Sequence, residues 1–370
     1  MIYLDHASHS PADPAVLAEF CRLAQDQAGM GNPMSAHSMG RAAAEEYEKA
    51  AEVVANFFGS EPGVAFTSGA SEANTLAIKG LAKANHHRGK HIIGTCLDHP
   101  SVSGPLAALR EQGYEIELAD INPDGTLDLD QLSDLLRQDT ILLCLPWVDS
   151  ELGAIQDIAA IAKLLEKYPD CHFHVDAAQA VGKVPVAFLG LDTLSFSAHK
   201  FNGLCGSGGL LVRKGAMQEA LLGGLLKWRS GTPALALAAS TAKALQLLEA
   251  MPSDYSKKAK ALRQGVLQAL QAYPKVRINS PPKGSPYILN ISVKGIKGSE
   301  FQAALDRRGV CVSVKSACSA QGTPSRPVMA VSNDRKNAMC SWRLSFSTRT
   351  EMQEVDAFLE AFDHCCKELS

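Results

Sequence analysis

The sequence lacks a long hydrophobic run and a strong charge of either sign. Its apolar stretches, such as the one around ALALAAS, are broken by charged residues well short of the roughly 20 residues that a membrane-spanning helix needs. Its 36 Lys and Arg residues nearly balance its 39 Asp and Glu residues, which leaves a net charge of −3. Composition therefore favours neither a membrane protein nor a nucleic-acid-binding protein.

The cysteines lack a regular pattern. Ten of them are spread from Cys21 to the adjacent pair Cys365 and Cys366, with no CxxC pair and no Cys/His cluster that has the spacing of zinc ligands. The first residues, MIYLDHAS, lack the basic and apolar regions of a secretory signal. We therefore expect reduced thiols, no metal site and a cytoplasmic location.

A regular alternation of strand and helix patterns runs over residues 60–215. Apolar runs such as GVAFTSG, KHIIGT and TILLCLPWV are typical of buried strands, and the segments between them have apolar residues at helical spacing. Strands that alternate with helices predict a mostly parallel sheet with helices on both faces. The sequence therefore predicts an α/β fold.

The pattern changes near residue 250. Beyond it, the strand patterns YILNISV, VCVSVKS and SWRLSFS lie among long helical patterns, which predicts a smaller α+β unit. Ahead of the alternating region, SAHSMGRAAAEEYEKAAEVVANFFG predicts one long helix that stops at Gly59. We expect a large domain over residues 14–250, and a small domain formed by residues 1–13 and 251–370.

Polar side chains follow the predicted strands at the point where each strand ends. They are Ser68 and Ser71 after the first strand, beside the free N–H group of Ala70 at a helix start, then Asp98 and His99, Asp149 to Glu151, Asp176 and Gln179, and finally His199 and Lys200. Each one alone has an ordinary structural explanation, such as a helix cap or a surface lysine. Because ligands bind at the carboxyl ends of parallel strands, polar groups at five such ends favour a single site.

This inventory of polar groups fits pyridoxal phosphate (PLP). PLP needs a lysine for a Schiff base, a carboxylate for its pyridinium nitrogen and a helix N-terminus for its phosphate. Lys200, in SFSAHKFNG, is the candidate lysine because burial favours a neutral, nucleophilic amine. Asp176 is the candidate carboxylate.

Motifs along nearly the whole chain resemble those of the NifS/IscS-type cysteine desulfurases, which are class V, fold-type I PLP enzymes. The matching segments are YLDHAS, GNPMSAHSMGR, FTSGASEANTLAIKG, DHPSV, ELGAIQDIAAIA, HVDAAQAVGKVPV, SFSAHK, RSGT and SACS. The resemblance implies the fold-type I PLP-dependent transferase architecture, with a large domain around a mostly parallel sheet and a smaller α+β domain. It also implies conversion of L-cysteine to L-alanine.

The resemblance implies a role for each cofactor residue. Lys200 would bind PLP covalently, Asp176 would pair with the ring nitrogen, and His99 would stack on the ring and take part in proton transfer. Gln179 and Ser150 stand where the family contacts the phenolic oxygen of the cofactor. The phosphate ligands would be Ala70, Ser71, Ser197 and His199 and, from the second subunit of a homodimer, Thr232.

The resemblance also implies how the substrate is handled. Arg343, in SWRLSFS, would bind the carboxylate of L-cysteine through its bidentate fork. Cys318, in SAC, would attack the substrate's sulfur and become a persulfide. The sulfur would then pass to an acceptor protein, such as an iron–sulfur scaffold or a relay for tRNA or cofactor thiolation. We expect Cys311 to be a small buried residue instead.

The sequence departs from the family pattern at several positions. Asp149 and Ser150 replace two asparagines, His6 replaces a tyrosine, GGLLKWRSGT is shortened, and VKSAC replaces SGSAC. Another class V PLP activity, such as a selenocysteine lyase or an aminotransferase with an incidental Cys318, is one alternative. A non-catalytic sulfur-relay subunit is another, although the retained cofactor residues argue against it.

Overall fold

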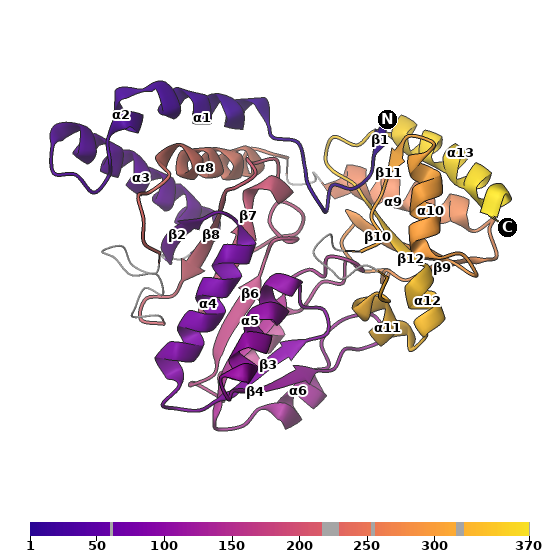
Figure 1. Cartoon of the computed structure of the whole chain (residues 1–370), viewed down its shortest axis with the longest axis horizontal. Helices are drawn as coiled ribbons and strands as arrows, with labels where there is room; N and C mark the ends of the chain where they lie inside the picture. The colour runs from indigo at the N-terminus through magenta and orange to yellow at the C-terminus, as the bar shows by residue number, and fades with distance from the viewer. Residues whose placement is uncertain (60–61, 217–228, 253–255, 316–321, 370) are drawn as a thin grey trace.

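The chain forms two lobes, each around its own β-structure (Figure 1). The computed structural model describes residues 1–59, 62–216, 229–252, 256–315 and 322–369. One lobe contains a seven-stranded sheet, and the other contains a three-stranded and a two-stranded sheet. Both termini lie on the second, smaller lobe, so the chain begins there, crosses to the larger lobe and returns (Figure 1).

The seven-stranded sheet has the order β2-β8-β7-β6-β5-β3-β4. Its strands are β2 (Gly63–Thr67), β3 (His91–Thr95), β4 (Glu115–Ala119), β5 (Thr140–Pro146), β6 (His172–Asp176), β7 (Thr193–Ser197) and β8 (Gly208–Val212). β8 runs antiparallel to both β2 and β7, the other neighbouring strands of the sheet are parallel, and every residue of β5, β6 and β7 is buried. The predicted α/β fold with a mostly parallel sheet is confirmed.

The helices of the larger lobe cover the sheet or pack on other helices. They are α1 (Pro14–Gln25), α2 (Gln27–Met30), α3 (Ser38–Phe57), α4 (Ala70–Asn85), α5 (Pro100–Glu111), α6 (Leu129–Leu135), α7 (Ile158–Leu165) and α8 (Leu235–Glu249). Of these, α1 and α2 pack on the helices α8 and α3. The predicted long helix is α3, which ends just before Gly59, where φ is +62° and glycine is favoured. No helix in the described ranges is both long and apolar enough to cross a membrane.

The smaller lobe packs short strands against helices around an aromatic core. Its strands are β1 (Ile2–Tyr3), β9 (Val276–Ile278), β10 (Ile288–Val293), β11 (Val310–Cys311) and β12 (Ser341–Ser345). Its helices are α9 (Ser256–Leu270), α10 (Gly298–Asp306), α11 (Arg326–Ser332), α12 (Arg335–Cys340) and α13 (Met352–Leu369). In its core, Phe301 stacks on Trp342 at 5.1 Å. The domain division at residues 14–250 stays a prediction.

Residues 5–10 run between the two lobes, and we call this segment the N-terminal strap. On the small-lobe side, the Ala7 N–H donates to Ser345 Oγ at 2.9 Å. On the other side, the Ser10 N–H donates to the carbonyl of His199, at the carboxyl end of the large sheet, at 2.9 Å. The strap therefore lies over the sheet edge where the polar residues were predicted.

Candidate active site

A cavity of about 270 Å³ lies at the carboxyl ends of β5, β6 and β7, just below the range of roughly 300–1,000 Å³ that is usual for ligand sites. Its lining includes these predicted site residues: Ala70, Ser71, His99, Ser150, Asp176, Gln179, Ser197, His199, Lys200 and Arg343. Residues that are far apart in the sequence thus meet at one point, as the strand ends predicted. Thr232 does not line this cavity.

Lys200 ends a short 3₁₀ helix (Ala198–Lys200) that follows β7 directly. Its Nζ donates to the carbonyls of Ala7 at 2.7 Å and Ser8 at 2.8 Å, both in the N-terminal strap. The amine therefore lies in the cavity, between the sheet edge and the strap.

Asp176 ends β6 and is held by a network that includes a residue not expected from the sequence, Asn74. Asp176 Oδ2 accepts from Asn74 Nδ2 at 2.9 Å, and Oδ1 accepts from the Ala178 N–H at 2.9 Å. Asn74 Oδ1 lies 2.9 Å from His174 Nε2, and burial lowers the pKa of His174 to about 4. The neutral imidazole of His174 holds the orientation of the Asn74 amide, and that amide in turn holds the orientation of the Asp176 carboxylate. The only signal for Asn74 was its place in the FTSGASEANTLAIKG motif.

His99 is the N-cap of α5 and lines the cavity. Its Nδ1 accepts the Ser101 N–H at 3.1 Å, so the proton of the neutral ring lies on Nε2. Burial lowers the pKa of His99, an effect that Asp176 opposes and Lys200 reinforces. A neutral ring with Nε2–H is suited to stacking and to proton transfer.

The start of α4 forms a cradle of small residues. The Ala70 N–H donates to Ser197 Oγ at 2.7 Å, and Gly69 has a φ of +147°, which side chains rarely allow. A Cβ atom on Gly208 would lie 2.7 Å from Gly69 Cα, so the cradle has no room for one. The buried Nδ1 of His199 has no hydrogen-bond partner in the described part of the chain. A helix N-terminus beside an unpartnered imidazole nitrogen fits a phosphate.

Arg343 lies in β12 with its side chain only 1% exposed. Its Nη1 donates to the carbonyl of Ser150 at 2.7 Å, and its Nη2 donates to Asp5 Oδ1 at 2.7 Å and Ser8 Oγ at 2.9 Å. Arg343 Nε has no partner among the described residues. The strap and the Ser150 backbone therefore hold a buried guanidinium at the edge of the cavity.

A pocket of about 350 Å³ adjoins this cavity and shares His99 and Ser150 with it. It contains Asp149, which is fully buried, and whose Oδ1 accepts the N–H groups of Glu151 and Leu152. Asp149 Oδ2 has no partner within the described ranges. Burial, reinforced by Glu151, raises the pKa of Asp149 to about 7, so this carboxyl is partly protonated at neutral pH.

The predicted nucleophile, Cys318, lies in residues 316–321, outside the described residues. The residues that flank this range, Lys315 and Thr323, line the same pocket as Asp149, and Lys315 Nζ donates to the Thr323 carbonyl at 2.8 Å. Cys311 is half-buried rather than fully buried, and it lies in the two-residue strand β11, which pairs with β1.

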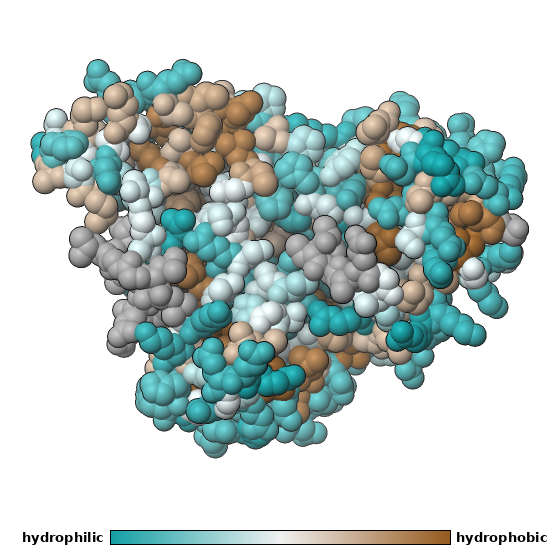
Figure 2. Space-filling model, viewed as in Figure 1, coloured by the Kyte–Doolittle hydropathy of each residue, from teal (hydrophilic) through white to brown (hydrophobic). Residues whose placement is uncertain are grey.

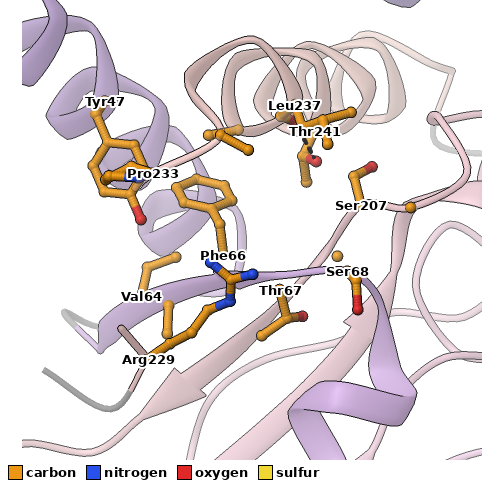
Figure 3. Close-up of a pocket in the computed structure, with 15 residues that line it drawn as sticks. Tyr47, Val64, Phe66, Thr67, Ser68, Ser207, Arg229, Pro233, Leu237 and Thr241 are labelled. Carbon is orange, nitrogen blue, oxygen red and sulfur yellow. Dashed lines mark hydrogen bonds between the residues drawn. The ribbon is translucent and has the colours of Figure 1, made fainter. Parts of the chain in front are cut away.

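A second cavity, of about 370 Å³, lies next to the start of α4, between α3, β2 and α8 (Figure 3). Figure 3 shows Tyr47 and Pro233 on the same side of it, and Arg229 reaching up from below. Arg229 Nε donates to Glu72 Oε1 at 2.7 Å, and Glu72 Oε2 accepts the Ser68 N–H at 2.6 Å. Thr232 follows in an exposed segment, so its role across a subunit interface stays a prediction.

Comparison with known proteins identifies the family of this chain. Residues 2–358 match the family model described as aminotransferase class V.

The chain belongs to the class V aminotransferase family.

Relatives in this family match over almost the full length of the chain. The NifS/IcsS protein homolog of Lactobacillus delbrueckii subsp. bulgaricus is 33% identical over 100% of this chain and 98% of its own. The cysteine desulfurase IscS of Proteus mirabilis is 34% identical over 97% of this chain and 91% of its own. A solved structure of a NifS-like protein superposes with a TM-score of 0.92 at 30% identity, over 99% of both chains. The class V assignment made from the motifs is confirmed.

Proposed function

We propose that this chain is a PLP-dependent cysteine desulfurase that converts L-cysteine to L-alanine and receives the sulfur on Cys318. The observation that carries the proposal is that Lys200, Asp176, His99 and Arg343 line one cavity. Relatives described as cysteine desulfurases, which match over nearly the whole chain, support the same activity.

The residues of the cavity fit PLP. Lys200 would bind it covalently, Asp176 would pair with the ring nitrogen, and the phosphate would lie between the N-terminus of α4, Ser197 and His199. Gln179 and Ser150 would face the phenolic oxygen. When bound, PLP withdraws electrons and weakens bonds at the α- and β-carbons of the substrate.

The remaining residues of the site would act on the substrate. The carboxylate of L-cysteine would bind Arg343 and compete with Asp5 for Nη2. Neutral His99, with its proton on Nε2, would move a proton near the leaving sulfur. The Cys318 thiolate would attack that sulfur, so that a sulfur–sulfur bond forms and the carbon–sulfur bond breaks. The electron pair would stay on carbon, which becomes the methyl group of alanine once protonated, and the persulfide would serve an acceptor protein.

A homodimer would complete the cofactor site with Thr232 of the second subunit. Figure 2 shows hydrophobic residues gathered over α1 and α8. The exposed hydrophobic residues between α1 and the start of α3 are Leu17, Met30, Met34 and Met39, of which Met30 is 74% exposed. A surface of this kind favours an interface. Light scattering that finds a monomer with tightly bound PLP would contradict the role of Thr232.

The direct test incubates pure, PLP-loaded protein with L-cysteine and a thiol reductant, and measures alanine and sulfide together. We expect the two in equal amounts, and neither from Lys200→Ala. Turnover of selenocysteine alone would indicate a selenocysteine lyase, and a keto acid in place of alanine would indicate an aminotransferase. Either result would contradict the proposal.

A further inference from the structure

Lys183 is a buried lysine that the steps above leave without a role. It follows β6, four residues after Gln179, and is only 7% exposed. Burial lowers its pKa well below the ordinary value, and the positive charges of Lys200 and Arg343 lower it further. Burial of an amine among cations is costly, so the contacts that Lys183 makes are informative.

Lys183 contacts a residue that lines the cavity. Its Nζ donates to Gln179 Oε1, and Gln179 is itself buried. At the other end of the same amide, Gln179 Nε2 donates to the carbonyl of Ala7 at 2.7 Å. This carbonyl also accepts from Lys200 Nζ at 2.7 Å. Lys183, Gln179, Ala7 and Lys200 thus form one continuous chain of hydrogen bonds into the cavity.

This chain fixes the orientation of the Gln179 amide from both ends. A flipped amide would place Oε1 against the carbonyl of Ala7, where two acceptors repel, and its NH₂ group against the Lys183 donor. In the observed orientation, Ala7 accepts one of the two N–H groups of Nε2, which leaves the second for a ligand of the cavity.

We propose that Lys183 is a positioning residue, which donates to Gln179 Oε1 and so keeps Gln179 Nε2 directed at Ala7 and at the phenolic oxygen of the cofactor. The inference rests on the proposed function, since PLP is the ligand. An ammonium group and a neutral amine both donate, so Lys183 can act in either protonation state.

The test compares Lys183→Met, Gln179→Leu and the double variant. Each apoprotein is titrated with PLP, and the dissociation constant and the absorption maximum of the bound cofactor are measured. One lost hydrogen bond weakens binding about three- to tenfold, so we expect this loss in each single variant, with the same spectral shift. We expect the double variant to lose no more than the weaker single variant, because both changes break one chain. Lys163→Met, at an exposed position of α7, is the control and should match the wild type.

Two further measurements separate positioning from a purely structural role. The apo form of Lys183→Met should unfold close to the wild-type temperature, because the loss of the donor to Gln179 Oε1 is offset by the removal of an amine buried among cations. Lys183→Gln, which keeps an N–H donor, should bring the absorption maximum closer to that of the wild type. A spectrum that does not respond to the donor, or a lowered unfolding temperature with an unshifted spectrum, would overturn the proposal.

Two results of the titration would also overturn it. Wild-type affinity and absorption maximum in Lys183→Met would show that Gln179 needs no support. Additive losses in the double variant would show that Lys183 acts independently of Gln179, through its charge on Lys200. If the wild type takes up no PLP at all, the proposed function fails first, and this inference fails with it.

Discussion

The cofactor side and the substrate side of the cavity are built in different ways. On the cofactor side, Asp176 and Lys200 come from the ends of adjacent strands of one sheet, and the cradle at the start of α4 is bonded to Ser197 at the end of β7. On the substrate side, Arg343 of β12 is held by Asp5, 338 positions away in the sequence. Strand order brings the first set to one sheet edge, where the strap then contacts Lys200, whereas the position of Arg343 depends on how the N-terminal strap joins the two lobes. The two sides should therefore respond separately to substitution.

The largest expected effect comes from Lys200→Ala, which removes the centre of the cofactor side. The wild type should retain PLP on Lys200 after borohydride reduction, as peptide mapping can show. The variant should lose covalent retention completely and lose turnover by at least about 10³-fold, because Lys200 is the only lysine among the described residues that line the cavity. A reduced adduct on a different lysine would contradict the assignment.

Cys318→Ser should abolish sulfur transfer from the substrate and leave PLP binding unchanged. We expect wild-type PLP binding, with alanine production from L-cysteine reduced by at least about 10²-fold, because a hydroxyl is a much weaker nucleophile than a thiolate. Cys311→Ser is the matched control and should keep full turnover. If Cys318→Ser keeps full turnover as well, Cys318 is not the sulfur acceptor.

Asp149 lies in the pocket that joins the two sides, and it should affect stability rather than cofactor binding. Because its pKa is about 7 in the folded protein and about 3.9 in an unfolded chain, the folded state binds the proton more tightly. Asp149 therefore costs stability progressively as the pH rises from about 4 to about 7. Asp149→Asn keeps the oxygen that accepts two N–H groups and removes this cost.

Urea unfolding at two pH values checks this sign. The free energy of unfolding of Asp149→Asn, relative to that of the wild type, should rise by about 3 kcal/mol between pH 4.5 and pH 8, because a pKa difference of about three units is nearly fully expressed at pH 8 and only slightly at pH 4.5. Comparing the variant with the wild type cancels the contribution of Asp98, whose pKa burial also raises to about 7. An equal difference at both pH values would show that Asp149 does not titrate in this range.

The difference between the cofactor side and the substrate side also explains which parts of the fold the sequence could predict. The strands of the large sheet and their polar ends followed from apolar runs and from the rule that parallel strands end at one edge. The short strands β1 and β9 carry too few residues for a pattern, and β1 is defined by its pairing with β11. The VCVSVKS pattern predicted a full strand, but the strand found is Val310–Cys311, followed by an isolated bridge between Ser313 and Arg343.

The sequence did not predict the residues that support the site, because their roles depend on contacts that form only in the folded chain. Asn74 lies on the buried side of α4 and Lys183 lies in the turn after β6, and their partners Asp176 and Gln179 are 102 and four positions away. The strap contacts of Arg343 join the first residues to the last strand. No local pattern encodes such pairings, although the motifs contained each of these residues.

Arg343→Lys tests the separation of the two sides most directly. In one variant, the dissociation constant for PLP and then that for L-cysteine are measured by absorption titration. We predict that PLP binding stays within about twofold of the wild type, and that L-cysteine binding weakens about 10- to 100-fold, because a lysine cannot hold a carboxylate with a bidentate fork. A loss of PLP affinity as large as the loss of L-cysteine affinity would contradict the account, because the two sides would then form a single unit.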